Sequence, residues 1–190
     1  MMLNLANKIT LLRMLITPVV IVLLYFHGPV TCVLATIAFA FAAMTDWIDG
    51  YVARRENMVT SMGKFLDPLA DKVLICSVLI MFCYLQWAPA WVVIVIVCRE
   101  LIVTGLRAMA IDEGMVLAAD KFGKAKTIVQ IIAILPMLLH DAVSQNLHLI
   151  FALGTFFLYA ALVLATISGL NYCLYFYKYV KEERSTKNNR

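Results

Sequence analysis

The sequence predicts an all-α, polytopic membrane protein with six transmembrane helices in a single domain covering residues 1–190. Of the 190 residues, 63% are hydrophobic and only 15% are charged, and a soluble domain of this length could not bury so much apolar surface. The apolar residues form six runs, most of them near the roughly 20 residues that span a hydrocarbon core of about 30 Å. Lysine and arginine gather in alternate connections between these runs, which is typical of a membrane protein with a cytosolic side.

The runs follow a short start in which apolar and polar residues alternate. This start, Met1–Lys8, indicates a short N-terminal interfacial helix. The predicted spans are Ile9–Phe26, Val30–Ala53, Phe65–Gln86, Pro89–Ala110, Ala125–His140 and Leu147–Tyr177. The fifth is short, and the sixth is long enough to tilt or to project into the cytosol. No small-residue cleavage site follows the first run, so we expect it to be retained as a span.

The distribution of lysine and arginine predicts the orientation of the chain. The connections around His27–Gly28, Gln86–Pro89 and His140–Leu147 contain neither residue, whereas the alternate connections and both ends of the chain contain several. The positive-inside rule therefore places both termini in the cytosol. We expect no transit peptide, and a chain of this length without one favours a bacterial inner membrane. We expect the lipid bilayer as a partner and no nucleic acid.

Four carboxylates near the cytosolic ends of the second and third predicted spans are the most informative feature. Positions i, i+3, i+4, i+7 and i+8 of one helix face in the second span are Asp46, Asp49, Gly50, Ala53 and Arg54. The third span adds Asp67 and Asp71, four residues apart, with Gly63 one turn before them. A hairpin between the two spans would bring these faces together, so we expect the carboxylates to converge in one cavity that faces the cytosol.

Carboxylates this close cannot all stay ionised without a compensating positive charge. One or two divalent cations supply that charge, and Mg²⁺ typically bridges carboxylates and substrate phosphates. Gly50 and Ala53 have no bulk, so a ligand or a neighbouring helix can approach the helix surface there. Arg54 offers a fixed cation to a phosphate or diphosphate. The segment therefore predicts a metal-dependent phosphate site.

Two other interpretations of the acids remain open. The first is a set of ordinary salt bridges with nearby cations, which are Arg54, Arg55, Lys64 and Lys72. The second is the ion or proton pathway of a cation-coupled transporter, which also uses intramembrane acids. Transporter sites usually lie near the midplane on broken helices, often in repeated halves. Here the acids lie at one rim and no internal repeat is visible, which weakens the transporter interpretation.

The same residues match a known signature. Asp46 to Arg54 followed by Gly63, Asp67 and Asp71 reproduces the motif D-x2-D-G-x2-A-R-x8-G-x3-D-x3-D of the CDP-alcohol phosphotransferases. The chain resembles that family in this motif, in its length and in its six predicted spans. The resemblance implies that an alcohol attacks the CDP-linked phosphorus of a CDP-alcohol, that a phosphodiester forms, and that CMP leaves.

The resemblance also implies roles for individual residues. Two divalent ions, Mg²⁺ or Mn²⁺, are expected on Asp46, Asp49, Asp67 and Asp71. Asp71 is the expected general base toward the acceptor hydroxyl. The expected contacts of the cytidine diphosphate part of the donor are Gly50, Ala53, Arg54 and Gly63. Such a pair of ions suits an in-line displacement, because it can clamp both the attacking and the leaving oxygen.

Further segments indicate which alcohol is the acceptor. They resemble members of the family that use glycerol 3-phosphate, and they are Asn7–Arg13, Arg99–Ile102, Arg107 and Gly123–Gln130. A phosphorylated acceptor needs a cationic site, which we expect at the cytosolic ends of the fourth and fifth spans, formed by Arg107, Lys124, Lys126, Thr127 and Gln130. CDP-diacylglycerol is the expected donor, with its acyl chains in the membrane. Phosphatidylglycerol and inositol phosphate remain alternative acceptors.

A few residues within the apolar runs have more than one interpretation. Arg99 and Glu100 fit either a structural ion pair or part of a polar pocket. Gly105, Gly154 and Gly169 are small residues that let helices approach closely, either within one chain or in a homodimer.

Overall fold

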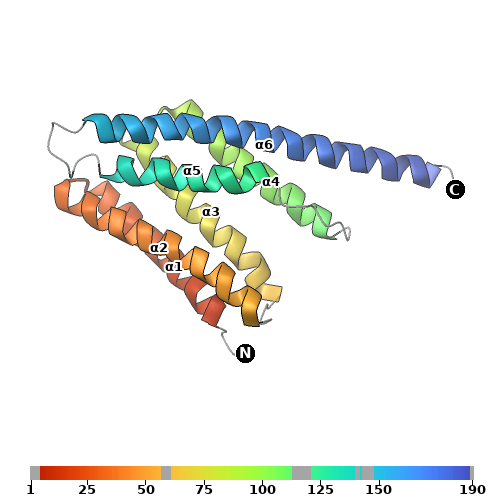
Figure 1. Ribbon diagram of the computed structural model, residues 1–190, viewed down its shortest axis with the longest axis horizontal. Coiled ribbons are helices and arrows are strands. Elements are labelled where there is room, and N and C mark those ends of the chain that lie inside the picture. Colours follow the sequence, from red (N-terminus) through yellow and green to blue (C-terminus); the bar gives the residue numbers. More distant parts are fainter. Residues whose placement is uncertain (1–4, 57–60, 113–120, 140–141, 143–147, 189–190) are drawn as a thin grey trace.

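The part of the chain that the structure describes is entirely helical (Figure 1). The structure is a computed structural model that describes residues 5–56, 61–112, 121–139, 142 and 148–188. Its six helices are α1 (Leu5–Tyr25), α2 (Pro29–Glu56), α3 (Ser61–Tyr84), α4 (Ala90–Asp112), α5 (Lys121–Leu138) and α6 (His148–Asn188). The predicted all-α class is confirmed, and apart from the end of α6 the helix ends lie within about four residues of the predicted ones.

The start of the chain differs from the prediction. No separate interfacial helix precedes the first long helix in the described residues, because Leu5–Lys8 form the first part of α1, which continues to Tyr25. No glycine or proline lies between Leu5 and Arg13, so nothing in the sequence ends a helix near Lys8. Residues 1–4 lie outside the described residues.

Helix α6 is the clearest membrane-spanning candidate. Among the described residues, only its segment Leu149–Lys178 is both long and apolar enough to cross a bilayer. Shorter apolar stretches occur in four other helices, at Thr10–Tyr25, Pro29–Thr45, Lys72–Tyr84 and Ala125–Leu138. The six predicted helices are therefore present, whereas the prediction that all six cross the membrane is not confirmed. Helix α6 also extends past the other helices at its C-terminal end (Figure 1).

The helices pack as two groups joined at their interface. Helix α1 packs against α2 and α3, and α6 packs against α5 and α4. Contacts of α2 with α5 and of α3 with α4 join the two groups. The α1–α2 connection, the end of α5 and the start of α6 lie together at the left of Figure 1, and the start of α1 and the end of α6 lie away from them. The end of the bundle with the start of α1 and the end of α6 is called here the terminal end, and the opposite end is called the distal end.

The hydrophobic core lies in the distal half of the bundle. Each helix contributes buried apolar side chains from the half nearest the distal connections, for example Leu24, Phe39, Phe82, Ile96, Met137 and Leu158. Many large apolar side chains on the outer surface are exposed, including Leu15, Val30 and Phe156. A soluble monomer rarely exposes so much apolar surface, whereas lipid is a favourable neighbour for it.

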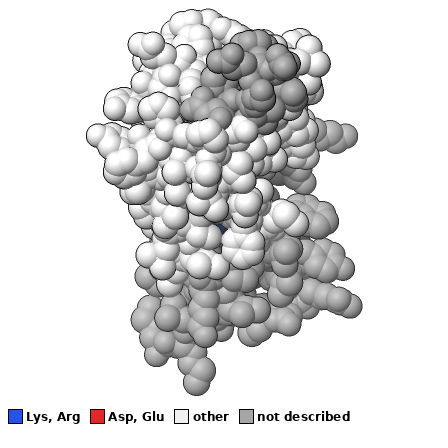
Figure 2. Space-filling view, turned by 90° about the vertical axis from the view of Figure 1, so that its left-hand side faces the viewer, with Lys and Arg blue, Asp and Glu red and all other residues white. Residues whose placement is uncertain are grey.

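The described part of the distal surface carries almost no charge. Figure 2 shows this face, and its described atoms belong almost entirely to residues other than Lys, Arg, Asp and Glu. Aromatic side chains gather at the same end: the stacked rings of Tyr25 and Tyr84 have centroids 6.1 Å apart, and Trp91 lies near Tyr159. Tyrosine and tryptophan are enriched where a protein meets the interface of a bilayer.

A tight turn aligns α3 with α4. Gln86 has a left-handed φ of 61°, its N–H donates to the Cys83 carbonyl, and the Trp87 N–H donates to the Phe82 carbonyl at 2.8 Å. The rings of Phe82 and Trp87 are also in contact, with centroids 5.6 Å apart. These features define a Schellman motif, which ends a helix sharply. Because α4 then runs back beside α3, residues at similar distances from the turn, such as Lys72 and Glu100, lie opposite each other.

Two of the three glycines expected at helix contacts do allow close approach within the chain. A Cβ on Gly154 of α6 would lie 3.0 Å from the Ala133 carbonyl oxygen of α5. A Cβ on Gly169 would lie 2.9 Å from Cγ of Arg99, so this glycine makes room for the arginine side chain. Around Gly105 no atom of the described residues lies within 4 Å of such a Cβ.

Candidate functional site

The signature residues lie on two successive helices at the terminal end. Helix α2 continues through Gly50 to Glu56, as the shared-face argument required, and α3 begins at Ser61, before Gly63. The side chains of the predicted metal and donor-binding residues lie outside the described part of the structure; they are Asp46, Asp49, Gly50, Ala53, Arg54, Gly63, Asp67 and Asp71. Their convergence and their ligands therefore stay predictions.

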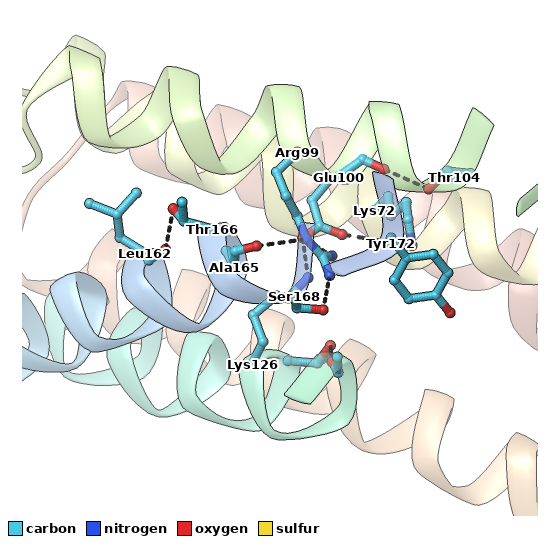
Figure 3. Close-up of polar contacts among 12 residues, drawn as sticks. Lys72, Arg99, Glu100, Thr104, Lys126, Leu162, Ala165, Thr166, Ser168 and Tyr172 are labelled. Carbon is cyan, nitrogen blue, oxygen red and sulfur yellow. Dashed lines mark hydrogen bonds and ion pairs between the residues drawn. The ribbon is translucent and has the colours of Figure 1, made fainter. Parts of the chain in front are cut away.

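Three cationic side chains of the bundle interior gather around Glu100 of α4 (Figure 3). The Glu100 side chain is buried, and its Oε1 accepts a hydrogen bond from Nζ of Lys126 on α5. The same oxygen lies 3.3 Å from Nη1 of Arg99. The second oxygen, Oε2, lies 3.8 Å from Nζ of Lys72 on α3. Cations from three helices thus share one carboxylate, and we call these four residues the Glu100 cluster.

Arg99 attaches the Glu100 cluster to α6. Its Nε donates to the Ala165 carbonyl at 3.2 Å and its Nη2 donates to Oγ of Ser168 at 2.7 Å. Together with the contact to Glu100, all three nitrogens of the guanidinium have a partner. A planar guanidinium held at three nitrogens keeps one orientation, so Arg99 fixes α4, α6 and Glu100 relative to one another.

The Glu100 cluster has an excess of positive charge. Among the described side chains, Lys72, Arg99 and Lys126 contribute three formal positive charges and Glu100 one negative charge, which leaves an excess of two. Buried or partly buried ions of one sign are costly unless an ion of opposite sign lies nearby. Lys72 directly follows Asp71 in the chain, so the cluster adjoins the helix segment that carries the signature acids. A phosphate group has the charge and the acceptor oxygens that such a cluster binds well.

The predicted acceptor residues of α5 have different surroundings. Lys126 belongs to the Glu100 cluster, whereas the Thr127 hydroxyl donates to the Gly123 carbonyl of its own helix at 3.3 Å. Gln130 lies one turn beyond Lys126 and is fully buried. Neither its amide nitrogen nor its amide oxygen has a hydrogen-bond partner among the described atoms. The Lys124 side chain lies outside the described residues.

Arg107 lies nearer the terminal end of α4 than the Glu100 cluster. Its Nη2 donates to the hydroxyl of Tyr172 on α6 at 2.9 Å, and its Cζ lies 5.6 Å from the centre of that ring. It follows Arg99 by eight residues, or about 12 Å along the helix axis. Their partners Tyr172 and Ser168 are one turn apart on α6. No contact between described residues joins Arg107 to Lys126, so the predicted site has two levels rather than one.

Several residues of this arrangement are absent from the site predicted from sequence. Arg99 and Glu100 are in contact, as the ion-pair interpretation required, and they belong to a larger polar cluster. Lys72 was considered only as a partner for the signature acids, yet its described ion pair is with Glu100. Ser168 and Tyr172 were not singled out. The available signal was weak: Glu100 is the only acid within the fourth apolar run, and Ser168 is the only serine within the sixth.

Comparisons with known proteins agree with the signature. A family model described as CDP-alcohol phosphatidyltransferase matches residues 3–167. A Bacillus subtilis protein named CDP-diacylglycerol–glycerol-3-phosphate 3-phosphatidyltransferase is 42% identical over 183 residues, covering 90% of this chain and 94% of the relative. A Rickettsia bellii protein of the same name is 34% identical over 169 residues, covering 89% and 93%. A Mycobacterium tuberculosis protein named probable phosphatidylglycerophosphate synthase is 41% identical over 172 residues, covering 89% and 79%.

Proposed function

Because this chain belongs to the CDP-alcohol phosphatidyltransferase family, we propose that it transfers the phosphatidyl group of CDP-diacylglycerol to glycerol 3-phosphate. The products are phosphatidylglycerophosphate and CMP, and the reaction belongs to phospholipid biosynthesis. The names of the relatives contain both substrates. The observation that carries the choice of acceptor is the excess positive charge of the Glu100 cluster, which adjoins Asp71 and suits an acceptor that bears a phosphate.

The chemistry of the signature acids fits divalent metal ions. Asp46, Asp49, Asp67 and Asp71 offer only carboxylate oxygens, which are the ligands that Mg²⁺ and Mn²⁺ prefer. These residues would hold two ions. When bound, such ions stabilise the negative charge that develops on the attacking and leaving oxygens of an in-line displacement.

The remaining steps, which are proton transfer and the binding of both substrates, are assigned to residues of the chain. Asp71 accepts the proton of the acceptor hydroxyl, whose oxygen bonds to the phosphatidyl phosphorus while the bond from that phosphorus to the CMP oxygen breaks. Arg54 pairs with the diphosphate, and the small residues Gly50, Ala53 and Gly63 leave room for the cytidine diphosphate. Lys126 is the proposed contact of the acceptor phosphate, and the further proposed contacts of the acceptor molecule are Arg107, Lys124, Thr127 and Gln130. The orphaned amide of Gln130 gains hydrogen-bond partners in this arrangement.

The protein is proposed to lie in a bacterial inner membrane with both termini and the site in the cytosol. The position of Lys126 near the terminal end of α5 and the nearly uncharged described surface of the distal face (Figure 2) support this orientation. The acyl chains of the donor stay in the lipid while its headgroup reaches the terminal end. A homodimer is also proposed, and the open space around the exposed Gly105 of α4 would let a helix of a second copy approach closely.

A direct assay of acceptor choice tests this function. Purified full-length protein in detergent is given CDP-diacylglycerol, Mg²⁺ and one of three acceptors: glycerol 3-phosphate, inositol phosphate or phosphatidylglycerol. We expect CMP release with glycerol 3-phosphate only, and loss of release after chelation that added Mg²⁺ or Mn²⁺ restores. Release only with phosphatidylglycerol would assign the protein to cardiolipin synthesis. No CMP with any acceptor would remove the enzyme proposal and return attention to cation-coupled transport.

A further inference from the structure

We propose that Glu100 is a positioning residue for the acceptor phosphate, because its carboxylate holds the ammonium groups of Lys126 and Lys72 in place. This inference rests on the proposed function and deepens it. It adds Glu100 and Lys72 to the residues on which glycerol 3-phosphate binding depends. Glu100 has the same charge sign as the substrate, so its contribution must come through the cations that it orders.

The geometry of the carboxylate supports this role. Its two oxygens bind cations from different helices: Oε1 contacts Lys126 of α5, and Oε2 lies 3.8 Å from Nζ of Lys72 of α3. Each ammonium group has three N–H donors, and one contact with Glu100 leaves donors free to bind phosphate oxygens. Both lysine stems are flexible and rich in rotamers, so fixing their ends before the substrate arrives lowers the entropic cost of binding.

The remaining members of the cluster hold Glu100 itself. The guanidinium of Arg99 contacts the carboxylate and is anchored by Ala165 and Ser168 of α6. Arg99 is therefore occupied on all three nitrogens and serves as the anchor, whereas the two lysines serve as phosphate donors. Without the carboxylate, three cations would face one another across a small interior volume, and mutual repulsion would move the flexible lysines apart.

Glu100→Gln tests the proposal, since it removes the charge and keeps the shape. In full-length protein in detergent, we expect the KM for glycerol 3-phosphate to rise by about tenfold or more, the effect of losing charge-assisted contacts. The kcat and the KM for CDP-diacylglycerol should change by less than about twofold. An unchanged KM for glycerol 3-phosphate, or equal losses for both substrates, would overturn the role. A lowered KM would instead show that Glu100 competes with the phosphate.

A double-mutant cycle tests whether Glu100 acts through Lys126. Lys126→Met removes the ammonium group at similar length, and Glu100→Gln added to it should raise the KM for glycerol 3-phosphate by less than it does alone, because only its action through Lys72 remains. Additive effects of the two substitutions would contradict the proposal. Thr104→Val is the matched control, because the Thr104 hydroxyl donates to the backbone carbonyl of Glu100 at 2.6 Å and not to its carboxylate. We expect this variant to keep the wild-type KM.

A second substitution and the activity of the wild-type protein complete the test. If Glu100→Gln does not yield folded protein by thermal unfolding, Glu100→Asp retains the charge and shortens its reach, and should still raise the KM for glycerol 3-phosphate selectively. Failure of the proposed function can be told apart from failure of the Glu100 role, because in that case the wild-type protein releases no CMP with glycerol 3-phosphate. Active wild type with a Glu100→Gln variant of unchanged KM would end only the role of Glu100.

Discussion

The distal and terminal halves of the bundle are held together by different forces. In the distal half, all six helices meet through buried apolar side chains such as Phe39, Phe82 and Ile96. In the terminal half, which means here the part of the bundle that follows this core from mid-bundle onward, α3, α4, α5 and α6 meet through ions and hydrogen bonds around Glu100. Apolar packing is favourable in itself, whereas a buried ionic cluster is not reliably so.

From this difference we expect the two halves to contribute differently to stability and to substrate binding. The distal half supplies much of the stability, so that the terminal half can hold an excess of like charges suited to binding and chemistry. Substitutions should accordingly fall into two groups. Those in the terminal half should alter kinetics with little change in unfolding, and those in the distal half should alter unfolding with little change in substrate affinity.

The largest kinetic effect is expected from a signature acid. Asp67→Asn should lower CMP release by about a thousandfold, because an amide is a poorer ligand and supports less stabilisation of transition-state charge by metal ions. The measurement is turnover at saturating CDP-diacylglycerol and glycerol 3-phosphate, with thermal unfolding recorded in parallel. Asp141→Asn makes the same chemical change in a connection predicted on the distal side, and it should be nearly neutral. Substantial activity of Asp67→Asn would remove Asp67 from the metal-binding set.

An intermediate effect, on stability, is expected in the distal half. Gly154→Ala places a Cβ 3.0 Å from the Ala133 carbonyl oxygen, and such overpacking of α5 against α6 costs about 1–3 kcal/mol. Thermal unfolding in detergent should shift downward while the KM for glycerol 3-phosphate stays constant. Gly28→Ala is the control, since a Cβ at that position would meet no atom closer than 3.8 Å among the described residues. A change of KM without a change of unfolding in Gly154→Ala would contradict the division between the two halves.

The smallest effect is expected from the contact between Arg107 of α4 and Tyr172 of α6. Tyr172→Phe keeps the ring beside Arg107 but removes the hydroxyl that accepts its hydrogen bond at 2.9 Å. Loss of one such bond should raise the KM for glycerol 3-phosphate about threefold. Tyr175→Phe, at an exposed position of the same helix, should change nothing. If both variants behave as wild type, Arg107 does not depend on Tyr172 for its role.

The sequence was sufficient for features that depend on neighbouring residues. Apolar runs predicted where the helices lie because each helix forms its backbone hydrogen bonds within one segment. The signature from Asp46 to Asp71 was readable because its residues recur at helical spacing on two consecutive helices. The interfacial helix was the exception: α1 runs unbroken from Leu5, because alternation of polar residues alone does not end a helix.

Only the tertiary structure decided which distant side chains share a site. Lys72, Glu100 and Lys126 lie on three helices, and they meet because the turn after α3 and the packing of α5 and α6 set the relative depth of those helices. Nothing in the local sequence around Lys126 indicates a carboxylate partner on another helix. The sequence by itself therefore determined the helices and the signature of the chemistry, whereas the packing of helices determined that Glu100 stands among the cations proposed to bind the acceptor.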